Sequence, residues 1–149
     1  MVGWSFQIPN EYNHFLALIL EGIPIENYYW KLNEDDIYIT LNFTPQCLFH
    51  SDKIDGKQFK EKVCLPSYYV CFAKLQAFSS DVHVHELFSF EEYVKSDCEL
   101  IILVTDGEFV EVYAKSKENL DKIQKNILKN KFSSLRPILQ YSDKEITSR

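Results

Sequence analysis

Two histidines separated by one residue, His83 and His85, have the spacing of a metal-ligand pair. If their segment is a strand, both imidazoles lie on one face, because side chains alternate along a strand. Such a pair could begin a zinc or iron site, with His50, Cys47 or Asp81 as the third ligand. The sequence alone does not place any of these three together with the pair in space. Surface histidines without a metal are the more frequent arrangement, so we expect no metal and no cofactor.

Nucleophilic chemistry has little support in the residue pattern. A reactive cysteine needs an electropositive setting and a base within reach. Cys98 lies between two carboxylates, Cys71 lies in an apolar run, and Cys47 has only His50 nearby in sequence. With four glycines, the chain has neither a phosphate-binding loop nor a nucleophile elbow. We therefore assign no catalytic residue, and keep an enzyme centred on the two histidines, dependent on a metal or a small ligand, as the alternative.

The net charge of −6 is distributed unevenly. Residues 1–114 hold seven Lys or Arg and eighteen Asp or Glu, whereas residues 115–149 hold nine and four. A mainly acidic surface disfavours nucleic acid and favours a basic protein. Lys122, Lys125 and Lys129 would share one helical face, but no aromatic side chains alternate with them for base stacking. We expect a basic protein partner and no nucleic acid.

Aromatic side chains make up 15% of the chain, and some are adjacent, as in Tyr28-Tyr29-Trp30. Neighbouring residues of a strand point to opposite faces, so either helices cover both faces of the sheet or some rings are exposed. Exposed Tyr and Trp beside carboxylates are typical of protein-recognition surfaces. We therefore predict a non-enzymatic protein-binding module, like an immunity protein or inhibitor that neutralises a basic partner; a homodimer is the alternative use of these strands. The predicted contact residues are Glu34, Asp35, Asp36, Tyr38, Glu111 and Tyr113.

The segment Leu100–Ala114 predicts a β-hairpin, because Asp106-Gly107 separates a β-branched run from an alternating one. A two-residue turn places four aliphatic side chains on the face that packs against helices: Ile101, Leu103, Val110 and Val112. The opposite face then holds a carboxylate among apolar side chains: Leu100, Ile102, Val104, Phe109, Glu111 and Tyr113. A three-residue turn would change this assignment of faces.

Apolar spacing and turn residues predict the other elements. Strands are expected at residues 3–8, 28–32, 37–43, 68–78 and 135–141, with an acidic turn at 33–36 and a loop at 44–55. Helices are expected at residues 12–20, after Asn10 as N-cap, and at 56–63, 89–95 and 116–130. Residues 142–149 are expected to be frayed. This order predicts a single α+β domain over residues 1–149, with a mixed, mainly antiparallel sheet and helices packed on its faces.

The cellular compartment is predicted from what the chain contains. Its four cysteines form no CxxC pair, which is typical of reduced thiols. It opens with no secretory segment, and no apolar run has the length of a membrane span. We expect a cytoplasmic protein with no membrane partner.

Three segments have the order and spacing of a known protein family: Ser5–Tyr12, Ala73–Phe78 and Ser96–Val104. With these segments, nearly the whole chain resembles a family of small proteins of unknown function from Bacillus-type Gram-positive bacteria. The resemblance implies a single-domain, cytoplasmic, bacterial protein. It supplies no catalytic residues.

Overall fold

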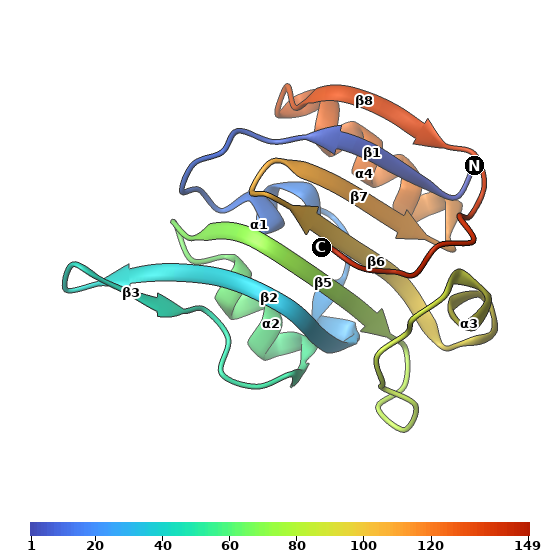
Figure 1. Ribbon diagram of the computed structural model, residues 1–149, viewed down its shortest axis with the longest axis horizontal. Coiled ribbons are helices and arrows are strands. Elements are labelled where there is room, and N and C mark those ends of the chain that lie inside the picture. Colours follow the sequence, from blue (N-terminus) through green and yellow to red (C-terminus); the bar gives the residue numbers. More distant parts are fainter.

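The computed structural model describes residues 1–149, and its centre is one antiparallel sheet of eight strands (Figure 1). The strands are β1 (Gly3–Gln7), β2 (Tyr29–Leu41), β3 (Thr44–Cys47), β4 (Lys53–Asp55), β5 (Tyr69–Phe78), β6 (Cys98–Thr105), β7 (Phe109–Ala114) and β8 (Ser133–Ile138). They lie side by side in the order β3-β2-β5-β6-β7-β1-β8, and β4 also pairs with β2. The central hairpin β6–β7 therefore lies between β5 and β1, in the middle of the sheet.

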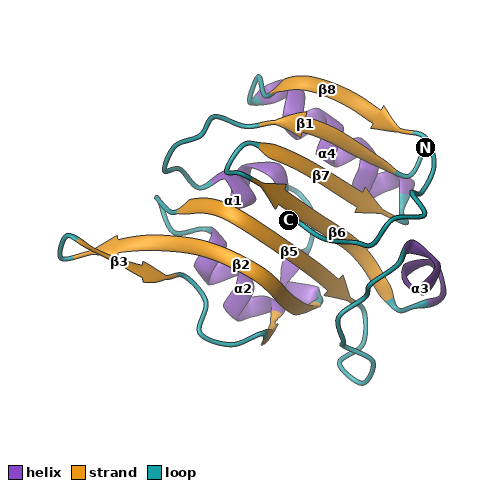
Figure 2. Cartoon of the chain, in the orientation of Figure 1, coloured by secondary structure: helices purple, strands orange, loops and turns teal.

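Three helices cover one face of the sheet, which we call the helix face (Figure 2). They are α1 (Phe15–Ile19), α2 (Gly56–Val63) and α4 (Lys117–Lys129), and the short 3₁₀ helix η1 (Ile25–Asn27) packs against α2. A core of 30 buried residues forms on this face. The opposite face, which we call the second face, carries α3 (Phe90–Lys95) and a smaller cluster of nine buried residues. The predicted single α+β domain is confirmed, and no helix is long and apolar enough to span a membrane.

Capping side chains set the boundaries of the longer helices. Asp55 and Ser116 cap α2 and α4 by accepting hydrogen bonds from backbone amides three residues further on. Both helices begin within one residue of their predicted start. The first helix was predicted three residues too early, because α1 begins only at Phe15. Asn10, the predicted N-cap, instead accepts a hydrogen bond from the hydroxyl of Tyr69 on β5.

The turn of the β6–β7 hairpin contains three residues and not the predicted two. Asp106 (φ 55°) and Gly107 (φ 69°) adopt the left-handed conformation, which Asp and Gly tolerate better than most residues. The amide of Glu108 donates to the carbonyl of Thr105, and pairing resumes between Thr105 and Phe109. The predicted register was therefore wrong by one residue.

This shift turns the side chains of β6 over relative to β7. Leu103 pairs with Glu111, and Ile101 pairs with Tyr113, so all four lie on the second face. The helix face instead receives Leu100, Ile102 and Val104, together with Val110 and Val112 as predicted. Glu111 and Tyr113 are thus surrounded by a different set of neighbours than the two-residue turn predicted.

β2 is a single strand of 13 residues, where two strands joined by an acidic turn were predicted. Its pairing with β5 continues on both sides of Glu34–Asp36, so the chain does not reverse there. The register shifts at these residues, and Glu34 has a φ of 52°. We call Glu34–Asp36 the acidic bulge. Residues 44–55, predicted to be a loop, contain β3 and β4, which pair along the outer edge of β2.

Residues 139–149, which we call the C-terminal segment, lie across the second face. Figure 1 shows this segment passing in front of β7 and β6 and ending over the middle of the sheet. Ile146 and Ser148 are each only 1% exposed. The prediction that residues 142–149 are frayed was therefore wrong, because the segment has its own buried anchor and polar partners.

Candidate functional site

Glu34, the first residue of the acidic bulge, is bound to the C-terminal segment. Its Oε1 accepts three hydrogen bonds, from the hydroxyl of Thr147 at 2.7 Å and from the backbone amide and hydroxyl of Ser148, both at 2.9 Å. Partial burial opposes the charged form, but these hydrogen bonds and nearby Lys74 outweigh it and lower the pKa of Glu34 below its usual value. Glu34 is thus an ionised acceptor that binds two successive residues.

Asp36, the last residue of the acidic bulge, binds Arg149. The guanidinium Nη2 lies 2.6 Å from Oδ2 of Asp36, and the guanidinium carbon lies 4.4 Å from the ring centroid of Phe72 on β5. The hydrogen bond from Arg149 to Asp36 raises the pKa of the guanidinium. Asp36 also accepts a hydrogen bond from the hydroxyl of Tyr38 at 3.4 Å. A carboxylate beside an aromatic ring is an arrangement suited to arginine.

Ile146 anchors the C-terminal segment ahead of these polar contacts. Its side chain is buried in the nine-residue cluster of the second face, which includes Leu103 of β6. The amide of Ile146 donates to the carbonyl of Phe88 at 2.9 Å. The hydroxyl of Thr105 donates to the carbonyl of Ser148 at 2.8 Å. Residues 146–149 are therefore held by apolar, hydrogen-bonding and ionic contacts in succession.

Two buried polar residues of β5 hold the neighbouring loop 79–89 against the second face. The Nζ of Lys74 lies 3.0 Å from Oε2 of Glu86 and 5.0 Å from the ring centroid of Phe88. Oε1 of Gln76 accepts from the amide of Leu87 at 2.8 Å. The sequence prediction missed both residues. The alternation of Lys74 and Gln76 with Ala73, Leu75 and Ala77 was the available signal for a polar face.

Glu111 and Tyr113 form a second group, separated from the acidic bulge by β5 and β6. The hydroxyl of Tyr113 donates to Oε2 of Glu111, and burial followed by this hydrogen bond raises the pKa of Tyr113. The ring of Tyr113 is 3% exposed and lies 6.3 Å, centroid to centroid, from that of Tyr141. The structure thus places the predicted contact residues at two places along the C-terminal segment and does not bring them into one patch.

Asp35 lies between the two residues that bind the C-terminal segment. Partial burial raises its pKa, with further contributions from the charges of Asp36 and Asp52. Neither Thr147 nor Arg149 bonds to Asp35, so its predicted contact role has no counterpart in this segment.

Three tyrosines continue the surface beyond Arg149, and we call Tyr12, Tyr38 and Tyr69 the tyrosine strip. Tyr38 and Tyr69 pair across β2 and β5, and the rings of Tyr12 and Tyr69 are 5.5 Å apart between centroids. Tyr12 is 45% exposed. Of these three, only Tyr38 was predicted as a contact residue. The turn near Asn10 that brings Tyr12 to this surface has no clear sequence signal.

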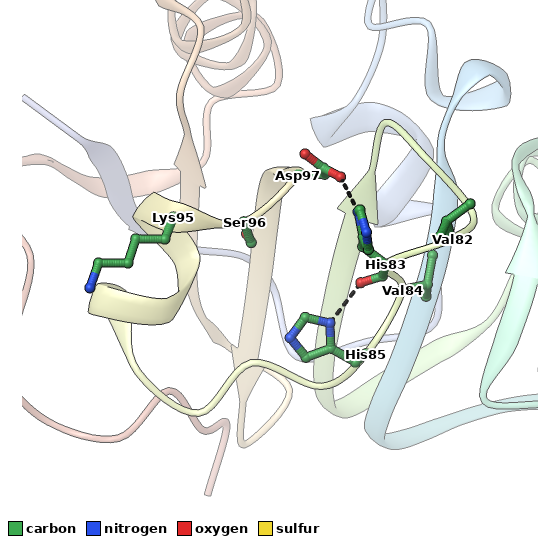
Figure 3. Close-up of a pocket in the computed structure, with 7 residues that line it drawn as sticks. All are labelled: Val82, His83, Val84, His85, Lys95, Ser96 and Asp97. Atoms are coloured by element: carbon green, nitrogen blue, oxygen red, sulfur yellow. Dashed lines mark hydrogen bonds and ion pairs between the residues drawn. The ribbon is translucent and has the colours of Figure 1, made fainter.

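His83 and His85 lie in the loop 79–89 and not on a strand (Figure 3). His83 Nδ1 is 2.7 Å from Oδ2 of Asp97, and His85 Nδ1 is 2.6 Å from the carbonyl of His83. Together with Val82 and Lys95 these residues line an open hollow of about 530 Å³. No group of three His, Cys, Asp or Glu side chains is placed to hold a metal ion. The predicted alternation that would align the two imidazoles does not apply to this loop.

All four cysteines are unpaired. Burial raises the pKa of Cys98 to about 12, and burial together with Asp36 and Asp106 raises that of Cys71. A raised pKa leaves less of the reactive thiolate at neutral pH. Cys71 and Cys98 therefore lack the lowered thiol pKa that is typical of a nucleophilic cysteine.

The fold and site describe a small α+β protein with one helix-covered face and one face occupied by its own C-terminal segment. The chain belongs to the family described as "Protein of unknown function (DUF2691)", which matches residues 1–148. It is similar to "Uncharacterized protein YncE" of Bacillus subtilis (strain 168), with 34% identity over 143 residues, 95% of this chain and 94% of the relative. The resemblance to a Bacillus-type family of unknown function is confirmed. No solved structure matches the chain.

Proposed function

We propose that this protein is a non-enzymatic protein-binding module whose acidic bulge takes an arginine-bearing segment of a basic partner. The observation that carries this proposal is the binding of Thr147, Ser148 and Arg149 by Glu34 and Asp36. A surface that accepts a basic, hydroxyl-bearing segment of its own chain has the chemistry to accept one from another protein. The arginine contact combines a charged hydrogen bond with ring stacking, which suits recognition better than a single ion pair.

The tyrosine strip supports the same proposal. It begins at Tyr38, which is bonded to Asp36, and extends through Tyr69 to Tyr12. Tyrosines present large, rigid contact areas and are enriched at the centres of protein interfaces. A partner segment bound at the acidic bulge could therefore continue over the strip.

The charge distribution supports a basic partner. The first 114 residues carry a net charge of −11, from seven basic and eighteen acidic side chains. Such a field accelerates encounter with a basic protein. We propose a role like that of an immunity protein or inhibitor, which acts by covering its partner. Four unpaired cysteines support a cytoplasmic location for this role.

Selection of random displayed peptides on the immobilised full-length protein tests this proposal. We expect enrichment of peptides that contain arginine, and loss of this enrichment in the variant Asp36→Asn with Tyr38→Ala. Asp36→Asn removes the carboxylate that binds the guanidinium, and Tyr38→Ala removes both the hydroxyl bonded to that carboxylate and one ring of the tyrosine strip.

Glu118→Gln on α4 is the matched control, since Glu118 is an exposed carboxylate with its own lysine partner, Lys122. It should retain the enrichment. Selection that yields no arginine-containing peptides, or yields them equally from the double variant, would refute the proposed binding surface.

A further inference from the structure

We propose that the partner presents an extended segment with the pattern of Ile146–Arg149: an aliphatic residue, two hydroxyl residues and an arginine. We also propose that Ile146–Arg149 competes with this partner segment for the same contacts. This inference rests on the proposed function and adds the partner's local chemistry and the regulation of the site.

Each position of the pattern has its own recognition element on the second face. The aliphatic side chain enters the cluster that contains Leu103. Both hydroxyls reach Oε1 of Glu34, and the guanidinium lies between Asp36 and Phe72. These contacts recognise the side chains of the bound segment as well as its backbone. A segment lacking the hydroxyls or the arginine would leave a carboxylate without its partner.

Residues 146–149 are joined to β8 by residues 139–145, which are held to the rest of the protein mainly by the side chain of Tyr141. Between Ile138, whose carbonyl accepts from Val2, and Ile146, no backbone group of residues 139–145 bonds to another part of the protein. Leu139 is 73% exposed, and Tyr141 is the only residue of this stretch that packs on the second cluster. Residues 146–149 can therefore leave the face without breaking the pairing of any strand.

Binding of the segment and of a partner must exclude one another. Oε1 of Glu34 already accepts three hydrogen bonds, and Oδ2 of Asp36 is bonded to Arg149. A second segment of the same pattern needs the same oxygens. A partner segment must therefore displace residues 146–149 before it can bind to Glu34 and Asp36.

Titration of the ¹⁵N-labelled full-length protein with the synthetic peptide Lys-Glu-Ile-Thr-Ser-Arg, followed by NMR, tests the inference. Two variants keep the chain length and open the site: the triple variant T147A/S148A/R149A, and independently Ile146→Ser. We expect the peptide to shift the amide signals of Asp36, Phe72 and Thr105. The peptide should half-saturate either variant at a concentration about tenfold or more below that needed for wild type, because apparent affinity falls with the fraction of free sites.

Two control peptides separate the parts of the inference. Replacement of Thr and Ser by Val, or of Arg by Gln, should each abolish these shifts. Equal titration of wild type and both variants would overturn competition by the C-terminal segment. Absence of shifts in both variants, while arginine-containing displayed peptides still bind, would overturn the pattern and leave the proposed function standing. Absence of both kinds of binding would overturn the two together.

Discussion

A carboxylate that accepts three hydrogen bonds at one oxygen depends on its negative charge, and Glu34 is in this position. Hydrogen bonds to a charged group are stronger than those between neutral groups. Each donor belongs to Thr147 or Ser148, so we expect the charge state of Glu34 to affect the docking of residues 146–149. The link that Glu34 makes between the acidic bulge and the C-terminal segment should therefore depend on pH.

Acidification should release the C-terminal segment. The folded-state pKa of Glu34 is lowered, so its stabilising contribution is complete above the usual Glu pKa of about 4.3 and is lost as pH falls through the folded-state value. We expect the Ser148 amide signal in NMR to move toward its undocked position only after the pH has fallen below the usual Glu pKa. Glu34→Gln should lower the free energy of unfolding at neutral pH by about 1–2 kcal/mol.

The same variant provides the control for the pH experiment. In Glu34→Gln the Ser148 signal should already lie partly toward the undocked position and should change little with acidification. A wild-type signal that stays constant down to the acid unfolding of the whole protein would contradict this role of Glu34.

The position of α2 depends on a close approach between two backbones. A Cβ added at Gly56, the first residue of α2, would lie 2.3 Å from the carbonyl oxygen of Glu26 and 2.6 Å from that of Tyr28. Neither carbonyl belongs to a flexible side chain, so the clash can be relieved only by moving the helix away from η1. The stacked rings of Trp30 and Phe59, with centroids 3.7 Å apart, join α2 to β2 and would move too.

Gly56→Ala should therefore destabilise the protein by at least about 2 kcal/mol, toward the upper end of the cost of overpacking. Chemical denaturation measures the change in the free energy of unfolding. Lys57→Ala, at the exposed neighbouring position, should change it by less than about 0.5 kcal/mol. Equal stabilities of the two variants would show that α2 does not depend on this approach.

Local sequence patterns predicted most helices and strands well. They failed where the same residues fit two different backbone arrangements. Helix α2 was predicted with its observed limits, and the structure shows that Asp55 fixes its start as an N-cap. The Asp106-Gly107 pair correctly indicated a hairpin, yet two- and three-residue turns both accept it, so the faces of β6 were reversed. Three acidic residues predicted a turn, but long-range pairing of β2 with β5 turned them into a bulge.

The site was predicted only in part for a similar reason. Glu34, Asp36 and Tyr38 were identified from their chemistry, and they do lie on one half-buried part of β2. Their principal partners, Thr147, Ser148 and Arg149, are more than a hundred residues away in sequence. Polar composition predicted fraying there, because no local pattern shows that Ile146 enters a cluster on a distant face.

The whole molecule contains two hydrophobic clusters of unequal size on the two faces of one sheet. The helix-face core has 30 buried residues and the second cluster has nine. Only the second cluster contains a residue of the C-terminal segment, Ile146. Since local openings have free energies well below global unfolding where few apolar contacts must break, the second face should open independently.

Hydrogen exchange of two variants, each with one isoleucine side chain shortened to alanine, tests whether the second face opens independently. Ile146→Ala should lower the free energy of unfolding by about 2 kcal/mol, near the low end for such truncations because the segment can relax into the space. Amides of residues 146–149 and the loop 79–89 should exchange faster, while those of β1, β5 and β6 keep their protection.

Ile102→Ala is the control, because Ile102 is fully buried in the helix-face core. This substitution should lower the free energy of unfolding by about 3–4 kcal/mol and speed exchange throughout the sheet. If Ile146→Ala instead lowers protection across the sheet as Ile102→Ala does, the two faces form one cooperative unit, and release of the segment could not occur without unfolding.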